Sequence, residues 1–336
     1  MNKKRVKMIL ALIIGFALLV FFIYRTGLDA VLLLIKNLNW FYFSIYFLLT
    51  ALTFVFLAWR WKVIIDCYGK KISFWMLLRQ VIAGFGVAYV TPSARLGGDP
   101  VKVYMLKKEA GIDYKTGSTS IILDRFVDLA GVSLLGIIGL SMFFYFPSSF
   151  LIRMVLGVAL FIIVFAVFGV YFRTIYRKGS FSSVFRFFRL HKLKKIGKFV
   201  KTLEHIEKQM HFFFVKHRNK LFLACFIYLL YGITMLLEVK FLLLSFGVDL
   251  SWFGVILALT TLGAANFLPV PGGIGFLEAG QSGLFFVLVG KESVGFAAAL
   301  LMRLNALIFT AIGFVIISFF TSGEMKKIKN LEGKIK

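Results

Sequence analysis

The fold is decided by a break in apolar sequence that reads Pro269-Val270-Pro271-Gly272-Gly273-Ile274-Gly275-Phe276-Leu277-Glu278. Proline lacks the backbone N–H that a helix requires, and glycine weakens a helix interior, so a regular helix cannot run through this stretch. The residues on both sides are strongly apolar. Helices that are broken inside hydrophobic sequence are typical of membrane transporters, in which the breaks surround the substrate site.

A similar break lies much earlier in the chain and reads Thr91-Pro92-Ser93-Ala94-Arg95-Leu96-Gly97-Gly98-Asp99-Pro100. Each break precedes a short helical stretch and then an apolar helix that carries a lone arginine. The arginine is Arg125 after the first break and Arg303 after the second. The sequence therefore predicts one structural unit that occurs twice.

The composition indicates a membrane protein. The chain is 60% hydrophobic and 16% charged, with a mean hydropathy of +0.89. A soluble chain of 336 residues could not bury that much apolar surface. Several runs approach the roughly 20 residues that a helix needs to cross the hydrocarbon core. These predicted spans are Met8–Tyr24, Trp40–Trp59, Ile121–Phe146, Phe150–Phe172, Leu221–Phe246 and Val294–Phe320.

The placement of lysine and arginine predicts the orientation. The formal net charge is +25, and the basic residues concentrate at the N-terminus, in the loop 173–220 and in the C-terminal tail. Basic segments stay in the cytoplasm, and we expect the same of Arg60, which follows the second predicted span. About six spanning helices with both termini cytoplasmic, in the cell (inner) membrane, satisfy these assignments.

The segments 74–110 and 252–290 each return to the side of the membrane that they left, as re-entrant hairpins or as pairs of short crossings. Backbone N–H and C=O groups that lack a helical partner are tolerated at membrane depth only where they contact protein or water. Because both segments contain the breaks, we predict re-entrant hairpin 1 (74–110) from the cytoplasm and re-entrant hairpin 2 (252–290) from outside. Two similar hairpins that enter from opposite sides of the membrane predict an all-α polytopic fold arranged as an inverted repeat.

The two arginines are predicted to lie roughly 15 Å inside the membrane, near its middle. Burying a guanidinium there costs free energy unless the charge is paired. A guanidinium can donate two parallel hydrogen bonds to the oxygens of a phosphate headgroup. For Arg125, an intrahelical pair with Asp128 is the alternative explanation. Arg303 has no acidic neighbour close by on its own helix. Its candidate partners are Glu278, Asp99 and Glu238.

The other candidate site residues cluster around the breaks. Gly97-Gly98 and Gly272-Gly273 would let the backbone approach a ligand closely, although close helix packing explains them equally well. Arg95 adds a further cation for substrate. The acidic residues expected to pair with the arginines or to relay protons are Asp99, Asp124, Asp128, Glu278 and Glu238.

The basic loop contains a second pattern. Apolar residues recur at helical spacing from Ile196 to Phe214, with lysines on the other faces. This predicts an amphipathic helix on the inner leaflet, with its lysines near anionic lipids. Nucleic-acid binding is the competing interpretation of the charge and is not expected between two spans. The four histidines of this loop do not share a helical face, so we expect no metal and no cofactor.

Three motifs together resemble one family. They are Leu96-Gly97-Gly98-Asp99-Pro100-Val101-Lys102-Val103-Tyr104, Leu123-Asp124-Arg125-Phe126-Val127-Asp128 and Leu268-Pro269-Val270-Pro271-Gly272-Gly273-Ile274-Gly275-Phe276-Leu277-Glu278-Ala279. The resemblance is to the lysylphosphatidylglycerol synthase transmembrane-region family, the flippase-like domain of the multiple peptide resistance factor. It implies a polytopic inner-membrane protein that acts on lipids. In the full resistance factor this domain moves aminoacylated phosphatidylglycerol to the outer leaflet, and a soluble domain synthesises it.

The chain ends at Lys336, soon after its last span, so we expect a stand-alone member without the synthase domain. Other stand-alone members are linked to polyprenyl-lipid and glycolipid pathways. The prediction is a translocase for a phospholipid, aminoacylated phosphatidylglycerol or polyprenyl-linked lipid. No nucleotide-binding loop is evident, so transport would be downhill or ion-coupled. The alternatives are an integral-membrane transferase of the phosphatidylglycerol lysyltransferase or glycosyltransferase type, and a membrane anchor for a separate lipid synthase. The oligomeric state is left open.

Overall fold

The computed structural model describes residues 36–69, 71–92, 96–143, 194–267 and 270–335, together with positions 165 and 169. The predicted spans Met8–Tyr24 and Phe150–Phe172 lie outside this part, apart from the two isolated positions, as does the start of the basic loop. Every regular element in the described part is helical. The predicted all-α class is thereby confirmed.

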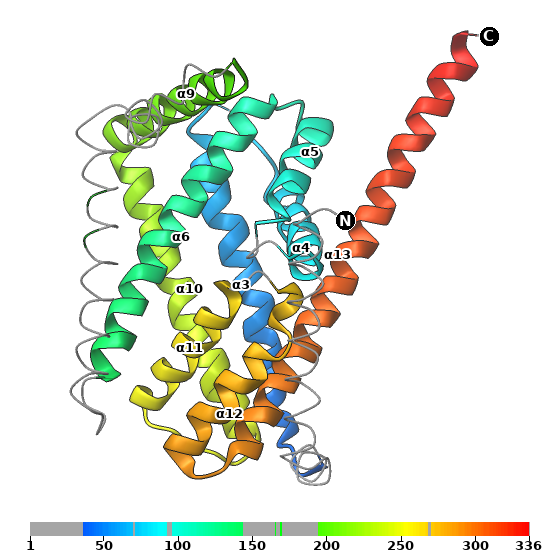
Figure 1. Cartoon of the computed structure of the whole chain (residues 1–336). Coiled ribbons are helices and arrows are strands. Elements are labelled where there is room, and N and C mark those ends of the chain that lie inside the picture. Colours follow the sequence, from blue (N-terminus) through cyan, green and yellow to red (C-terminus); the bar gives the residue numbers. More distant parts are fainter. Residues whose placement is uncertain are drawn as a thin grey trace. The chain divides into compact units, whose positions relative to one another are not determined.

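The longest helices are α3 (Trp40–Asp66), α6 (Tyr114–Phe143), α10 (Arg218–Ser245) and α13 (Glu292–Ile335), shown in Figure 1. Four segments among the described residues are long and apolar enough to cross a membrane. They are Trp40–Asp66, Arg218–Ser245, Pro271–Val289 and Glu292–Thr321. Their length and composition support a multi-pass membrane protein.

Each predicted hairpin consists of helices separated by a break. The first contains α4 (Phe74–Val90) and α5 (Asp99–Ala110). The second contains α11 (Trp252–Phe267), the single 3₁₀ turn η2 (Pro271–Gly273) and α12 (Phe276–Val289). The Pro/Gly runs therefore end helices where the sequence indicates. Taken together, η2 and α12 also reach the length of one crossing, so re-entry into the membrane stays a prediction.

The chain forms two compact units that alternate along the sequence. Unit 1 consists of Met1–Val55, Phe74–Leu106 and Ile233–Lys336, and unit 2 consists of Phe56–Ser73 and Lys107–Gly232. In unit 1, α13 packs against both α4 and α12, and α11 packs against α12 (Figure 1). Unit 1 thus contains both breaks and the helix that carries Arg303.

Glycines allow the helices of unit 1 to pack closely. A Cβ atom on Gly313 of α13 would lie 2.6 Å from the carbonyl oxygen of Ile82 in α4. A Cβ on Gly295 of α13 would lie 2.3 Å from the carbonyl oxygen of Gln281 in α12. Small residues at such crossings bring helix backbones together, as is common in membrane proteins. The close crossings fix α13 against one helix of each broken segment.

Unit 2 has its own apolar core, to which α9 (Lys194–Lys216) contributes. Met210, Phe213 and Phe214 of α9 are buried in a cluster with Ile64 of α3 and Phe126 of α6. The rings of Phe126 and Phe214 meet edge to face, with their centroids 5.9 Å apart. This part of the apolar stripe packs on protein, whereas its spacing predicted contact with the inner leaflet. An amphipathic stripe has the same spacing in either setting.

Candidate functional site

Arg303 lies at the second break, held by a buried carboxylate. Its Nε donates to Oε1 of Glu278 at 2.7 Å, and its Nη2 lies 2.5 Å from the same oxygen. Its Nη1 donates to the carbonyl oxygen of Gly272 at 3.3 Å. Glu278 is fully buried, and its Oε2 accepts the backbone N–H of Gly275 at 2.8 Å. Glu278 therefore neutralises Arg303 and caps the start of α12.

The corner at this break depends on glycine. Gly272, Gly273 and Gly275 have φ angles of 56°, 61° and 80°. Side chains disfavour this left-handed region, and glycine enters it freely. The conformation directs the carbonyl of Gly272 toward the guanidinium of Arg303. The corner and the arginine thus form one connected structure.

The second break touches the end of the helix that leads into the first break. Tyr89 lies in the last turn of α4, immediately before the first Pro/Gly run. A Cβ atom on Gly272 would lie 2.9 Å from Cζ of Tyr89. Phe85, one turn earlier, stacks on Tyr89 with ring centroids 6.0 Å apart. The two broken segments therefore meet in unit 1, at the same corner to which Arg303 is bound.

The first break uses its glycines differently. A Cβ atom on Gly98 would lie 1.9 Å from the carbonyl oxygen of Gly84, so α5 begins directly against the backbone of α4. Gly97 and Gly98 are not among the glycines with positive φ. Asp99 begins α5, and its carboxylate lies 2.8 Å from Nζ of Lys102. The first glycine pair permits close packing, whereas the second permits an unusual backbone conformation. Arg95 lies outside the described residues.

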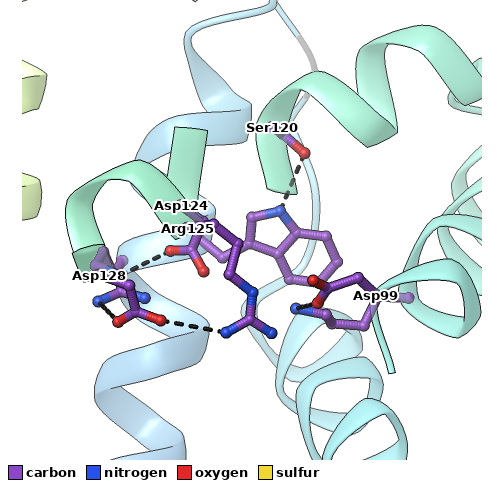
Figure 2. Close-up of polar contacts among 8 residues, drawn as sticks. Asp99, Ser120, Asp124, Arg125 and Asp128 are labelled. Atoms are coloured by element: carbon purple, nitrogen blue, oxygen red, sulfur yellow. Dashed lines mark hydrogen bonds and ion pairs between the residues drawn. The ribbon is translucent and has the colours of Figure 1, made fainter. Parts of the chain in front are cut away.

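A second group of charges lies in unit 2 (Figure 2). Arg60 of α3 donates from Nε to Asp124 at 2.7 Å and from Nη1 to Asp128 at 2.8 Å. The other carboxylate oxygen of Asp128 accepts Nη1 of Arg125 at 3.3 Å, so Asp128 lies between two guanidinium groups. The guanidinium carbon of Arg60 lies 5.4 Å from the ring centre of Tyr228, within range of a cation–π interaction.

Arg60 and Arg125 differ sharply in exposure. The side chain of Arg60 is 1% exposed, and that of Arg125 is 34% exposed. Arg60 makes the two short contacts with these aspartates, and the contact of Arg125 with Asp128 is longer. The two cations balance the charge of the two carboxylates. The predicted intrahelical pair between Arg125 and Asp128 is present, but Asp128 is shared with Arg60. Of Arg60 and Arg125, it is Arg125 whose side chain is exposed enough for a ligand to contact it.

The role of Arg60 does not follow from the sequence, in which this residue comes after the second predicted span and is expected in the cytoplasm. Helix α3 continues past the predicted end of the span, to Asp66, and Arg60 is buried among its partners. One signal was available. The predicted span 121–146 carries Asp124 and Asp128 against one arginine, so its buried charge requires another cation.

The remaining predicted residue, Glu238, lies on α10 in unit 1 and is not the partner of Arg303, which is bound by Glu278. Two residues after Arg303 on α13, Asn305 donates to the hydroxyl of Thr50 at 2.7 Å. Within the described residues, no three His, Cys, Asp or Glu side chains gather into a metal site.

Comparison with known proteins agrees with the resemblance drawn from the three motifs. The family described as "Lysylphosphatidylglycerol synthase TM region" matches residues 8–313. A UPF0104 membrane protein of Pyrococcus horikoshii is 23% identical over 314 residues, which cover 89% of this chain and 92% of the relative. One from Methanothermobacter thermautotrophicus is 26% identical over 287 residues, covering 80% and 82%. One from Methanocaldococcus jannaschii is 31% identical over 130 residues, covering 39% of each chain. No solved structure matches the chain.

Proposed function

Because the chain belongs to the lysylphosphatidylglycerol synthase transmembrane-region family, we propose that it moves a lipid between the leaflets of the cell membrane. The cargo is a lipid whose headgroup carries an anionic phosphate: a phospholipid, aminoacylated phosphatidylglycerol or a polyprenyl-linked lipid. The observation that carries the proposal is the meeting of the two broken segments at Gly272 and Tyr89, beside Arg303. Broken helices that converge in this way form the substrate sites of transporters.

In this proposal the broken segments are re-entrant hairpins of an inverted repeat, and both termini are cytoplasmic. The contact between Tyr89 and Gly272 closes the path between the hairpins. The path opens when Tyr89 moves away from the corner, and the headgroup then passes while the hydrocarbon tails stay in the lipid. Alternating exposure of a central site in this manner is the usual mechanism of inverted-repeat transporters.

The two predicted arginines have different roles. Arg125 binds the headgroup, since a guanidinium donates two parallel hydrogen bonds to phosphate and its side chain is 34% exposed. Arg303 holds the corner in shape, because its Nε already donates to Glu278 and its Nη1 to the carbonyl oxygen of Gly272. Arg60 neutralises the two aspartates on the helix of Arg125. The aspartates therefore do not repel an anionic headgroup as two bare charges would.

The test is a leaflet-accessibility assay in reconstituted vesicles that contain fluorescent phosphatidylglycerol. Hydrogen bonds to charged groups contribute about 1.5–3 kcal/mol, so Arg125→Gln should slow transport roughly ten- to hundredfold. Lys115→Gln is the matched control, because Lys115 is exposed at the start of the same helix. Transport at the wild-type rate in Arg125→Gln would overturn this mechanism. A new lipid product that forms only with an added donor would instead indicate a transferase.

A further inference from the structure

Helix α9 has a second face, opposite to the one that packs on protein. At about 100° per residue, Lys208 and Phe212 project from the side of the helix opposite to Met210, which is buried. A shallow depression of about 540 Å³ lies on this second side. The α9 outer face, as we name it, is formed by the residues that line this depression: Lys208, His211, Phe212, Val215 and Lys216.

The α9 outer face combines exposed apolar groups with cations. Phe212 is 45% exposed and Val215 is 47% exposed, although both are large and apolar. Lys208, Phe212 and Lys216 are each separated by four residues, so the aromatic ring lies between two lysines along one side of the helix. Nζ of Lys216 lies 5.1 Å from the ring centre of Phe212. Aromatic rings flanked by lysine are characteristic of helices at the membrane–water boundary.

The helix that follows indicates where the hydrocarbon begins. Phe222, Phe226 and Leu229 of α10 are 73%, 54% and 57% exposed. Their spacing of four and three residues places them on one side of a helix that is long and apolar enough to span the membrane. Large apolar side chains with this exposure on a spanning helix face acyl chains. The stripe begins shortly after Lys216, so the end of α9 lies at the depth of the headgroups.

We infer that the α9 outer face binds an anionic phospholipid of the adjacent leaflet. Lys208 and Lys216 contact the phosphate, while Phe212 and Val215 reach the boundary between headgroup and acyl chain. The two lysines favour an anionic occupant, and the exposed Phe212 and Val215, next to the exposed apolar stripe of α10, favour a lipid over an acidic protein segment. The face carries two lysines, and Glu207, 5% exposed, lies on the buried side of the helix. This lipid is a resident of the protein surface and not the transported cargo, so the inference goes beyond translocation.

The test measures which lipid touches the α9 outer face in the full-length protein. Val215→Cys, in a background with Cys67→Ala and Cys225→Ala, is labelled with an environment-sensitive fluorophore and reconstituted into mixed vesicles. The vesicles contain phosphatidylcholine and phosphatidylglycerol, with bromine on the acyl chains of only one of the two, close to the glycerol. Brominated phosphatidylglycerol should quench the label severalfold more than its mole fraction predicts. High salt should remove this preference.

The double variant Lys208→Gln/Lys216→Gln should lose the preference, by about fivefold for each lysine, since each basic residue near an anionic surface contributes about that factor. The pair Lys107→Gln/Lys108→Gln in the last turn of α5 is the matched control and should retain it. Three outcomes would overturn the inference: no quenching by either lipid, quenching in proportion to mole fraction, or an unchanged preference in the double variant. Because the readout is lipid contact and not transport, each of these leaves the translocase proposal standing.

Discussion

Replacing Arg60 with glutamine should destabilise the protein far more than replacing Lys62, two residues later. Arg60 is 1% exposed and holds Asp124 and Asp128 at 2.7 and 2.8 Å. Removing one partner of a buried ion pair costs about 3–5 kcal/mol, because the other charge stays buried without compensation. The pair of Lys62 with Asp66 is 29% and 30% exposed, and such pairs contribute about 0–1 kcal/mol.

The assay is chemical unfolding of the purified protein in mixed micelles, followed by the loss of helical circular dichroism. Arg60→Gln should lower the unfolding free energy by about 3–5 kcal/mol, and Lys62→Gln by no more than about 1 kcal/mol. The double variant Arg60→Met/Asp124→Asn removes one cation and one carboxylate, leaves Asp128 paired with Arg125, and should recover most of the loss. Equal effects of the two single variants would refute the buried-charge reasoning. So would a double variant as unstable as Arg60→Gln.

Two further predictions concern local structure. Gly98→Ala should destabilise unit 1 by about 1–3 kcal/mol through overpacking, because its Cβ would lie 1.9 Å from the carbonyl oxygen of Gly84. Gly280→Ala is the control, since its Cβ would have no neighbouring atom within 4 Å. This variant should be neutral or stabilising in the same unfolding assay. The N–H of Thr116 donates to Asp113 ahead of α6 at 3.0 Å, and this hydrogen bond lowers the carboxyl pKa. Stability from a lowered carboxyl pKa is present above the unfolded-state pKa of about 4 and is lost as the pH falls through the folded-state value. Asp113→Ala should therefore cost about 1 kcal/mol at neutral pH and progressively less in acid, and a pH-independent difference would contradict this assignment.

The charge pattern of the spans could be predicted from sequence only within one helix. The pair of Arg125 with Asp128 follows from a spacing of three residues. The partners of Arg60 lie 64 and 68 residues away along the chain, and no local pattern encodes that pairing. Arg60 also follows a long apolar run, where a basic residue ordinarily marks the end of a span. Only the unbalanced charge on the helix of Arg125 indicated that a further cation was needed.

The breaks illustrate the same limit. The Pro/Gly runs correctly predict where helices end, because proline and glycine act through the local backbone. The two glycine pairs look equivalent in sequence, yet Gly272 and Gly273 adopt positive φ, whereas Gly98 makes room for Gly84. Such roles depend on what lies opposite each glycine in space. The apolar stripe of α9 is a similar case, since its spacing fits a leaflet and a protein core equally well.

If lipid passes where the two broken segments meet, transport requires that Tyr89 can move away from Gly272. Replacing Tyr89 with the photoreactive p-azidophenylalanine keeps a ring of similar size against Gly272, and irradiation then joins it to the corner. The same replacement at Phe85 is the matched control, because that ring meets Phe54 of α3 with centroids 5.1 Å apart.

Transport is measured before and after irradiation, and mass spectrometry identifies the joined peptides. Joining position 89 to residues 270–275 should abolish lipid transport, whereas irradiation at position 85 should leave transport intact. Full transport by the protein joined at position 89 would show that lipid does not pass between the two broken segments.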